Sequence, residues 1–471
     1  MTIKTNRRLL TYISVIICHL SLGTVLTSCD SQLDITPKGK VTLGTVDELE
    51  LLLNQEYIMN DEPANSLGIL CGETVGMFDQ VNTVLSQTNT VKYALLACDE
   101  TVDRATLTTE DARYATLYRY INYMNTVITK MPEATGDEQS KPSLVAEARV
   151  MRAWLHLLAA AIYASQYDEA TVATAGGIPY VTETEVTVQK TKSTLADTYR
   201  QILDDCSDEV IAALPADHGT MVMRGDRAWG NAVRAMVLLQ MKRYAEALPY
   251  AQQAISLRPQ MFDRASIKQA GVWTQEQSSG NNLLYMGGAT RVCPTMAMIT
   301  RETSKLFETG DYVINYDSPG WSLDYGKTYS GLSGIRMYMG WSAQCNVYGL
   351  TSEQLRYVAA ECMIRTGNIA QALTLIDEVR AMRVENAVPS AASSEQEAMA
   401  VLQKAKFIEC IATPFNFMDR KRWNTEPQYQ RDIVHNLGTL GSYTLRPESP
   451  LWVQPFPANA VRYNPSLTQN Y

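Results

Sequence analysis

Histidine and paired cysteines are scarce in this 471-residue sequence. Only four histidines occur, and those beyond residue 29 (His156, His218 and His435) lie far apart without a second metal-ligating residue at helical spacing. The nine cysteines are scattered, and no C-x-x-C motif is present. Metal sites and disulfide frameworks both need such residues at short, regular spacings. The sequence therefore predicts no metal site and no disulfide framework, and it carries no indication of a cofactor.

Catalytic motifs are also missing. The sequence contains no G-x-S-x-G, H-E-x-x-H or Walker A motif, and the near match at Gly331–Gly334 reads as a turn. Glycan hydrolysis needs two carboxylates on either side of the bond. With 50 acidic residues, however, no particular pair stands out. We therefore expect a protein that is not an enzyme.

Positive charge is in short supply as well. The formal net charge is −9, and three of the basic residues (Lys4, Arg7 and Arg8) belong to a segment that we expect to be removed. An acidic chain is a poor ligand for nucleic acid. Apolar residues make up 46% of the sequence, which is enough for a substantial core. Phenylalanine is rare (7) and tyrosine common (25), which favours partly wet binding surfaces.

Only one apolar run is long enough to matter for a membrane. It covers Leu9–Leu26, follows the basic residues, and ends in the sequence Leu26-Thr27-Ser28-Cys29. An uncleaved membrane anchor is one interpretation, since the run has 18 residues. The small residues before Cys29 favour the other interpretation, a lipoprotein signal peptide over residues 1–28 with acyl chains such as palmitate attached at Cys29.

The rest of the chain reads as mainly helical. Apolar residues recur every three or four positions from Glu110 to Pro132 and from about Ser143 to Ala164. A third such stretch, from about Thr194 to Leu214, is followed by Pro215. The periodicity predicts three amphipathic helices that pack against one another.

Two segments match the spacing of a tetratricopeptide unit, in which small residues occupy the crossing of two helices. In Asn231–Pro259 these positions hold Ala235, Ala247 and Ala254. In Leu355–Val384 they hold Ala360 and Ala372, with Val379 in place of the third alanine. We therefore predict two helix pairs with buried alanines at their crossings.

Two other regions lack a sustained helical stripe. Residues 264–349 are rich in Gly, Ser, Tyr and Trp, and residues 60–108 are similarly irregular. We expect loops with short strands and helical turns in both. Their bulky side chains argue against disorder.

Aromatic residues gather in one part of the first region. Between Tyr312 and Tyr348 there are eight in 37 positions, interleaved with short polar side chains, against 8% aromatic residues in the whole chain. Sugar rings stack on aromatic rings, and their hydroxyls need polar partners. The segment is therefore a candidate ligand site, with Trp321 and Trp341 as stacking platforms, Tyr325 and Asp324 at the rim, and Tyr338 nearby. The alternative is that these aromatic rings simply pack the subdomain.

Several sequence strings together resemble the RagB/SusD family of surface nutrient-binding lipoproteins. They are LDITPKGKV and ELELLLNQEY after Cys29, AEARVMRAWLHLLAAAIY followed by GGIPYV, and the C-terminal PFPANAVRYNPSLTQNY. They occur in order over nearly the whole mature chain. One block departs from the family pattern. Glu409, Asp419, Arg422 and Trp423 are kept, but Thr413-Pro414 stand where Glu-Gly is expected. We expect Asp419 and Arg422 to form an internal ion pair.

The resemblance implies a scaffold of tetratricopeptide-like helix pairs with an irregular subdomain laid across it. It further implies a surface-exposed protein of the outer membrane that binds oligosaccharide and delivers it to a SusC-like TonB-dependent transporter. Family members also bind ligand through loops after the first helix, here around Met77–Gln80, which adds Phe78 and Asp79 to the candidate residues. Oligopeptide binding, or a scaffold that binds only protein partners, remains an alternative.

The expected organisation has five parts. It comprises the signal peptide (1–28), a tether with the first helix (29–60), an N-terminal part with helix pairs and one repeat unit (61–263), the irregular ligand-binding subdomain (264–349), and a C-terminal part with the second repeat unit (350–471).

Overall fold

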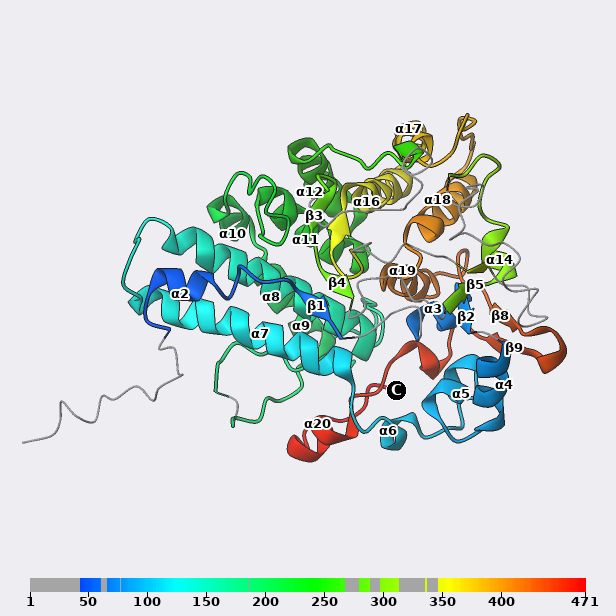
Figure 1. Ribbon diagram of the computed structural model, residues 1–471, viewed down its shortest axis with the longest axis horizontal. Coiled ribbons are helices and arrows are strands. Elements are labelled where there is room, and N and C mark those ends of the chain that lie inside the picture. Colours follow the sequence, from blue (N-terminus) through cyan, green and yellow to red (C-terminus); the bar gives the residue numbers. More distant parts are fainter. Residues whose placement is uncertain are drawn as a thin grey trace, which may run out of the picture. The chain divides into compact units, whose positions relative to one another are not determined.

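The structure, a computed structural model, describes residues 43–60, 66–76, 78–185, 187–266, 279–288, 297–312, 335–336 and 346–471 (Figure 1). Residues Thr45–Tyr471 form one compact unit. Helices dominate the described residues, and the strands are two to four residues long. This confirms the predicted fold class.

The longest helices, α7 (Ala112–Lys130) and α8 (Lys141–Tyr163), correspond to the first two predicted helices and pack against each other. Asp111 caps α7 by accepting hydrogen bonds from the backbone of Arg113 and Tyr114. From Val150 to Tyr163, every side chain of α8 is buried. A helix that is buried on all sides belongs at the centre of a fold, and α8 indeed contacts several neighbouring helices.

The third predicted helix, Thr194–Leu214, is wrong as a single element. The structure has α9 (Leu195–Asp205) and α10 (Asp208–Ala213) instead. The chain leaves the helical conformation at Cys206, and Ser207, whose ψ is 163°, caps α10 with a side chain that accepts a hydrogen bond from the backbone of Val210. Serine favours this capping arrangement over a helix interior. The N-cap thus divides the helix in two, although the apolar pattern of the sequence continues through both parts.

Both predicted helix pairs are present. They are α11 (Arg227–Gln240) with α12 (Tyr244–Leu257), and α16 (Ser352–Arg365) with α17 (Ile369–Ala381). The members of each pair pack together, and α12 also packs against α16. The predicted burial is confirmed, because the crossing residues are all 0% exposed: Ala235, Ala247, Ala254, Ala360, Ala372 and Val379.

The chain leaves this helical stack and returns to it at one place. After α12, the backbone oxygen of Arg258 accepts a hydrogen bond from Ser352 Oγ at 3.1 Å. The oxygen of Pro259 accepts another from Arg356 Nη2 at 2.8 Å. The point where the chain leaves the stack and the point where it returns are therefore adjacent.

Most of the remaining described elements lie on one side of these helices in Figure 1. The helices are α2 (Val46–Glu50), α3 (Leu67–Leu70), α4 (Phe78–Ser86), α5 (Val91–Leu96), α6 (Arg104–Leu107), α14 (Arg301–Ser304), α18 (Glu395–Glu409), α19 (Phe415–Trp423) and α20 (Ala458–Tyr463). Single 3₁₀ turns cover Met131–Glu133, Gly438–Leu440 and Pro450–Trp452. The expected irregularity of residues 60–108 is only partly right, since α4 has nine residues and α5 has six.

The strands form small separate sheets. Parallel β1 (Ile58–Met59) and β4 (Gly287–Gly288) make one, and antiparallel β3 (Asn282–Leu284) and β7 (Leu350–Thr351) another. The hairpin of β8 (Ile433–Asn436) and β9 (Ser442–Leu445) makes a third. The fourth contains β2 (Thr74–Gly76), β5 (Ala297–Ile299) and β6 (Ile335–Arg336). Residues 264–349 thus contain the short strands that their sequence predicts.

Two of the motifs that carry the family resemblance bind each other. Asn470 Nδ2, near the C-terminus, donates to the oxygens of Gly177 at 2.9 Å and Tyr163 at 2.7 Å. A Cβ atom on Gly177 would lie 2.2 Å from Thr198 Oγ1, and one on Gly176 would lie 2.3 Å from Asn470 Oδ1. The paired glycines are therefore needed for close approach of these segments.

The C-terminal block serves as internal packing. Arg422 Nη2 lies 2.8 Å from Asp419 Oδ1, which confirms the expected ion pair, and both Arg422 nitrogens also bind Glu361 at 2.6 and 2.8 Å. At the departure from the family pattern, Pro414 is the N-cap of α19 and Ala412 has a φ of 65°. Thr413 Oγ1 donates to the oxygen of Cys410 at 2.7 Å. The block thus keeps its packing role, and residues 412–414 form a turn directly before α19.

Candidate functional site

A three-stranded antiparallel sheet joins two distant parts of the chain. Its order is β2-β5-β6, with Gly76 opposite Ala297 and Met298 opposite Arg336. Strand β2 ends two residues before Phe78, and β6 lies inside the aromatic segment Tyr312–Tyr348. Neighbouring strands are about 4.8 Å apart, so the backbones of β2 and β6 lie about 10 Å apart. The sheet therefore places Ile335 and Arg336, inside the aromatic segment, one strand away from β2, which leads into α4.

The individual candidates differ in what the structure shows of them. Trp321, Asp324, Tyr325, Tyr338 and Trp341 lie outside the described residues, as does Cys29. Phe78 and Asp79 begin helix α4. The expectation of a loop at Met77–Gln80 is therefore wrong from Phe78 onward, although the helix starts directly beside the sheet.

Tyr348, at the end of the aromatic segment, is a core residue. Its side chain is 0% exposed, and its backbone oxygen accepts a hydrogen bond from Trp154 Nε1 at 3.0 Å. Tyr348 therefore packs the interior of the protein and is not part of a binding surface, which was the alternative interpretation of these aromatic rings.

Glu73 fastens the sheet to the helical scaffold. Its carboxylate accepts hydrogen bonds from the backbone of Ala412 and, at 2.9 Å, from Asn416 Nδ2 of α19. Its backbone oxygen accepts a hydrogen bond at 3.1 Å from Thr300, which follows β5. Glu73 is fully buried, and this burial raises its pKa to about 7 while the two hydrogen bonds act in the opposite direction.

A second attachment holds residues 310–312, where the described chain enters the aromatic segment. The amide of Tyr312 donates to the oxygen of Arg383 at 3.0 Å, and the amide of Glu385 donates to the oxygen of Gly310 at 2.9 Å. Asp311 and Val384 form a β-bridge between these bonds. The loop after α17 therefore fixes the start of the segment.

A third attachment holds residues 346–349, where the described chain leaves the segment. Asn346 Oδ1 accepts hydrogen bonds from the amides of Met286 and Gly349, both at 3.0 Å. Its Nδ2 donates to the oxygen of Leu284 at 2.7 Å. A Cβ atom on Gly349 would lie 2.1 Å from that same oxygen, so only glycine fits there.

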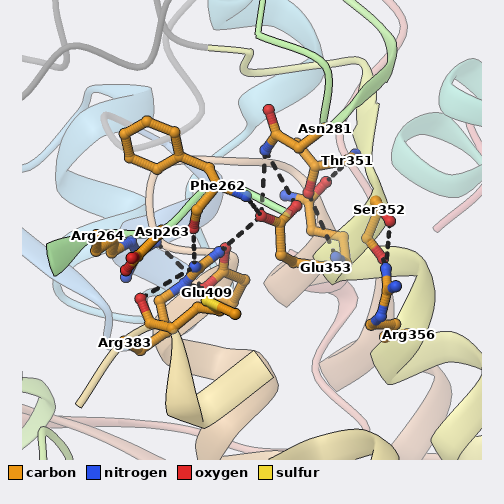
Figure 2. A network of polar contacts seen from close by, with 12 residues as sticks. Phe262, Asp263, Arg264, Asn281, Thr351, Ser352, Glu353, Arg356, Arg383 and Glu409 are labelled. Atoms are coloured by element: carbon orange, nitrogen blue, oxygen red, sulfur yellow. Dashed lines mark hydrogen bonds and ion pairs between the residues drawn. The ribbon is translucent and has the colours of Figure 1, made fainter. Parts of the chain in front are cut away.

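Arg383, whose backbone oxygen binds the amide of Tyr312, belongs to a buried network of charged side chains (Figure 2). Arg383 binds Glu409 through two bonds of 2.8 Å, and its Nη2 lies 3.1 Å from Glu353 Oε1. Arg264 also contacts Glu409 at 3.2 Å. Glu353, at the start of α16, accepts hydrogen bonds from Asn281 Nδ2 and from the amide of Phe262. Burial raises the pKa of Glu409, but the charges of Arg264 and Arg383 outweigh this and hold it below its ordinary value.

Sequence reasoning did not find this network. Its charged members are separated by up to 145 positions, and the sequence singles out only Glu409 among them, as part of the C-terminal block. In the part of the chain that the structure describes, no three His, Cys, Asp or Glu residues are grouped so that they could hold a metal ion. None of the helices described is long and apolar enough to cross a bilayer.

Comparison with known proteins identifies what this architecture resembles. Residues 33–235 match the SusD-like_3 family model, whose description is "Starch-binding associating with outer membrane". No protein of curated function matches the chain.

Solved structures show the same fold. One is a Bacteroides vulgatus protein described as sugar-binding, with a TM-score of 0.68 and 15% identity over 92% of this chain and 99% of that one. A SusD superfamily protein of Bacteroides thetaiotaomicron has a TM-score of 0.66 and 16% identity over 91% and 100%. A SusD-like carbohydrate-binding protein of B. vulgatus has a TM-score of 0.64 and 14% identity over 90% and 97%.

Proposed function

We propose that the chain is a member of the RagB/SusD family that binds oligosaccharide at the cell surface and delivers it to a SusC-like TonB-dependent transporter. The observation that carries this proposal is the match of residues 33–235 to a starch-binding, outer-membrane family. The basic residues, the apolar run and Cys29 support attachment to the outer membrane by a lipid. Such a tether would keep the binding protein at the membrane that holds the transporter.

The proposed binding surface combines the aromatic segment with the start of α4. Trp321 and Trp341 would stack against sugar rings, and the other candidates would bind the edges of the rings: Asp324, Tyr325, Tyr338, Phe78 and Asp79. The sheet β2-β5-β6 supports this grouping, because it places the backbone of Ile335 and Arg336 one strand away from β2, which precedes α4. An aromatic stacking contact contributes about 0.5–1.5 kcal/mol, so loss of one ring should weaken binding several-fold.

Calorimetric titration of the chain from Asp30 to Tyr471 tests the proposal. The probes are maltoheptaose, cellohexaose, xylohexaose and a mixture of short peptides. We expect one of the oligosaccharides to bind and not to be cleaved, and we expect Trp321→Ala and Trp341→Ala each to weaken that binding.

Tyr463→Ala is the matched control. Tyr463 is an aromatic side chain with 70% exposure on α20, and α20 lies apart from β2 and β5 in Figure 1. Binding of peptides alone would replace the proposed ligand with the alternative. Cleavage of a probe would overturn the assignment as a binding protein, and unchanged affinity in both tryptophan variants would move the site elsewhere.

A further inference from the structure

Arg420, on α19, is a buried cation with little to neutralise it. Its side chain is 2% exposed, and its Nη1 donates one long hydrogen bond, of 3.3 Å, to the backbone oxygen of Tyr429. Among the described residues, no carboxylate pairs with this guanidinium group, and no acceptor binds its Nε or Nη2. Burial of a charge is costly unless a partner neutralises it. The fold therefore leaves Arg420 in need of an anion.

The carboxylate next to Arg420 in the sequence is already paired with other cations. Asp419 lies 2.7 Å from Lys406 Nζ and 2.8 Å from Arg422 Nη2. Arg104 shows how a buried arginine without a carboxylate can be satisfied, because its two Nη atoms bind backbone oxygens at 3.0 Å each. Arg420 has only one such bond, which leaves the edge formed by Nε and Nη2 without an acceptor in the described part of the chain.

A second arginine lies close to Arg420. Arg431 follows Tyr429 by two residues, is exposed, and makes no side-chain hydrogen bond or ion pair with any residue that the structure describes. Burial, and after it the charge of Arg431, lowers the pKa of Arg420 to about 9. Because like charges repel, an anion between the two side chains would stabilise both.

The turn after α3 fixes this arrangement from the other side. A Cβ atom on Gly72 would lie 2.9 Å from Ile433 Cγ2, so the start of β8, two residues after Arg431, packs directly on that turn. Burial raises the pKa of the Cys71 thiol in the same turn, and the charges of both arginines act on it in the opposite direction.

The unbonded nitrogens are also open to solvent. The described side-chain atoms that are enclosed and lack a partner include Nε of Arg422 but no atom of Arg420 or Arg431. An ion can therefore reach Arg420 from the side of the exposed Arg431.

We propose that Arg420 and Arg431 form a binding site for a tetrahedral oxyanion, sulfate or phosphate, either as the free ion or as an ester on a larger ligand. The open edge of Arg420 can donate two parallel hydrogen bonds, and Arg431 offers a complete guanidinium group. The two oxygens of a carboxylate would be taken up by one arginine, whereas sulfate and phosphate have oxygens for both. The site goes beyond the proposed function, since neither arginine belongs to the surface proposed to bind sugar rings.

Calorimetric titration of the chain from Asp30 to Tyr471 with sodium sulfate and sodium phosphate, in chloride buffer at constant ionic strength, tests the site. We expect at least one of these anions to bind. Hydrogen bonds to charged groups are strong enough that Arg420→Gln and Arg431→Gln should each weaken binding by about ten-fold or more. Because Arg431 is exposed, Arg431→Gln keeps the test valid if Arg420→Gln fails to fold.

Arg119→Gln is the matched control. Arg119 is an exposed arginine on α7 that lies over the ring of Tyr120, and its loss should leave anion binding unchanged. Glucose 6-sulfate and glucose 6-phosphate, compared with glucose, separate the two sources of the anion. Tighter binding of an ester than of the free ion, lost in Arg420→Gln, would identify an ester as the ligand, and the reverse order would identify the free ion.

Three results would overturn the proposal. They are no binding of sulfate, phosphate or either ester, unchanged affinity in both Arg420→Gln and Arg431→Gln, and an equal loss in Arg119→Gln. None of them depends on binding of the uncharged oligosaccharides, so failure of the proposed function and failure of the anion site are separate outcomes.

Discussion

Glu73 is a buried carboxyl group whose described side-chain partners are both neutral, so its ionisation should oppose folding at neutral pH. Burial raises its pKa from 4.5 to about 7 in the folded chain, and the unfolded chain returns it to 4.5. Below pH 4.5 both states are protonated and the group costs nothing. Between pH 4.5 and 7 only the unfolded chain ionises, so stability falls as the pH rises, and above pH 7 the loss is complete. The difference between the two pKa values corresponds to about 3 kcal/mol.

Glu73→Gln removes this titration. The amide nitrogen of the glutamine has to compete with Asn416 Nδ2, which donates to the carboxylate in the wild type. That competition adds a cost that is independent of pH. The informative quantity is therefore the free energy of unfolding of the variant minus that of the wild type. We expect this difference to rise by about 3 kcal/mol between pH 4.5 and 7 and then to level off.

Urea unfolding of the chain from Asp30 to Tyr471, followed by tryptophan fluorescence at several pH values, measures this difference. Glu361→Gln is the control. Burial alone would raise the pKa of Glu361, but the charge of Arg422 and its hydrogen bonds hold it below its ordinary value. Its difference curve should therefore be flat from pH 5 upward. A flat curve for Glu73→Gln, or one that falls between pH 4.5 and 7, would refute the reasoning.

Three further predictions concern the scaffold and the anchor. Ala247→Leu should overpack the crossing of α11 and α12 and reduce the free energy of unfolding by about 1–3 kcal/mol, whereas Ala245→Leu, at an exposed position of the same helix, should not. Gly177→Ala should lower the thermal midpoint because its Cβ would meet Thr198, while Gly280→Ala, with its nearest neighbour at 3.8 Å, should leave it unchanged. In cell fractionation, the Cys29→Ala variant should no longer be found with the membranes. If the variant still stayed with the membranes through its own N-terminus, lipid attachment at Cys29 would be contradicted.

The helical scaffold was predictable from the sequence because its signals are local. The apolar stripes of α7 and α8 and the small residues at the helix crossings each follow from a repeat within a short window. The pairing of Asp419 with Arg422 is local too, since three positions separate them on one helix turn. The division between α9 and α10 was missed because the apolar pattern runs through Ser207, and only the cap at that residue marks the boundary.

The candidate site was less predictable because long-range pairings hold it together. Strands of two or three residues, such as β2 and β6, are too short to show an alternating pattern. Arg383 and Glu353 become partners only after α16 and α17 have packed. Composition did indicate the aromatic segment, but it could not tell a core ring from an exposed one, as the burial of Tyr348 shows.

The hydrogen bonds of Ser352 and Arg356 to the backbone after α12 have an evolutionary consequence. The chain leaves the stack after Arg258 and rejoins it at Ser352, so these two points lie together on a stack that continues directly from α12 to α16. Insertions with adjacent ends disturb their host least. Changes in length or sequence between these two points can therefore accumulate without displacing α12 from α16.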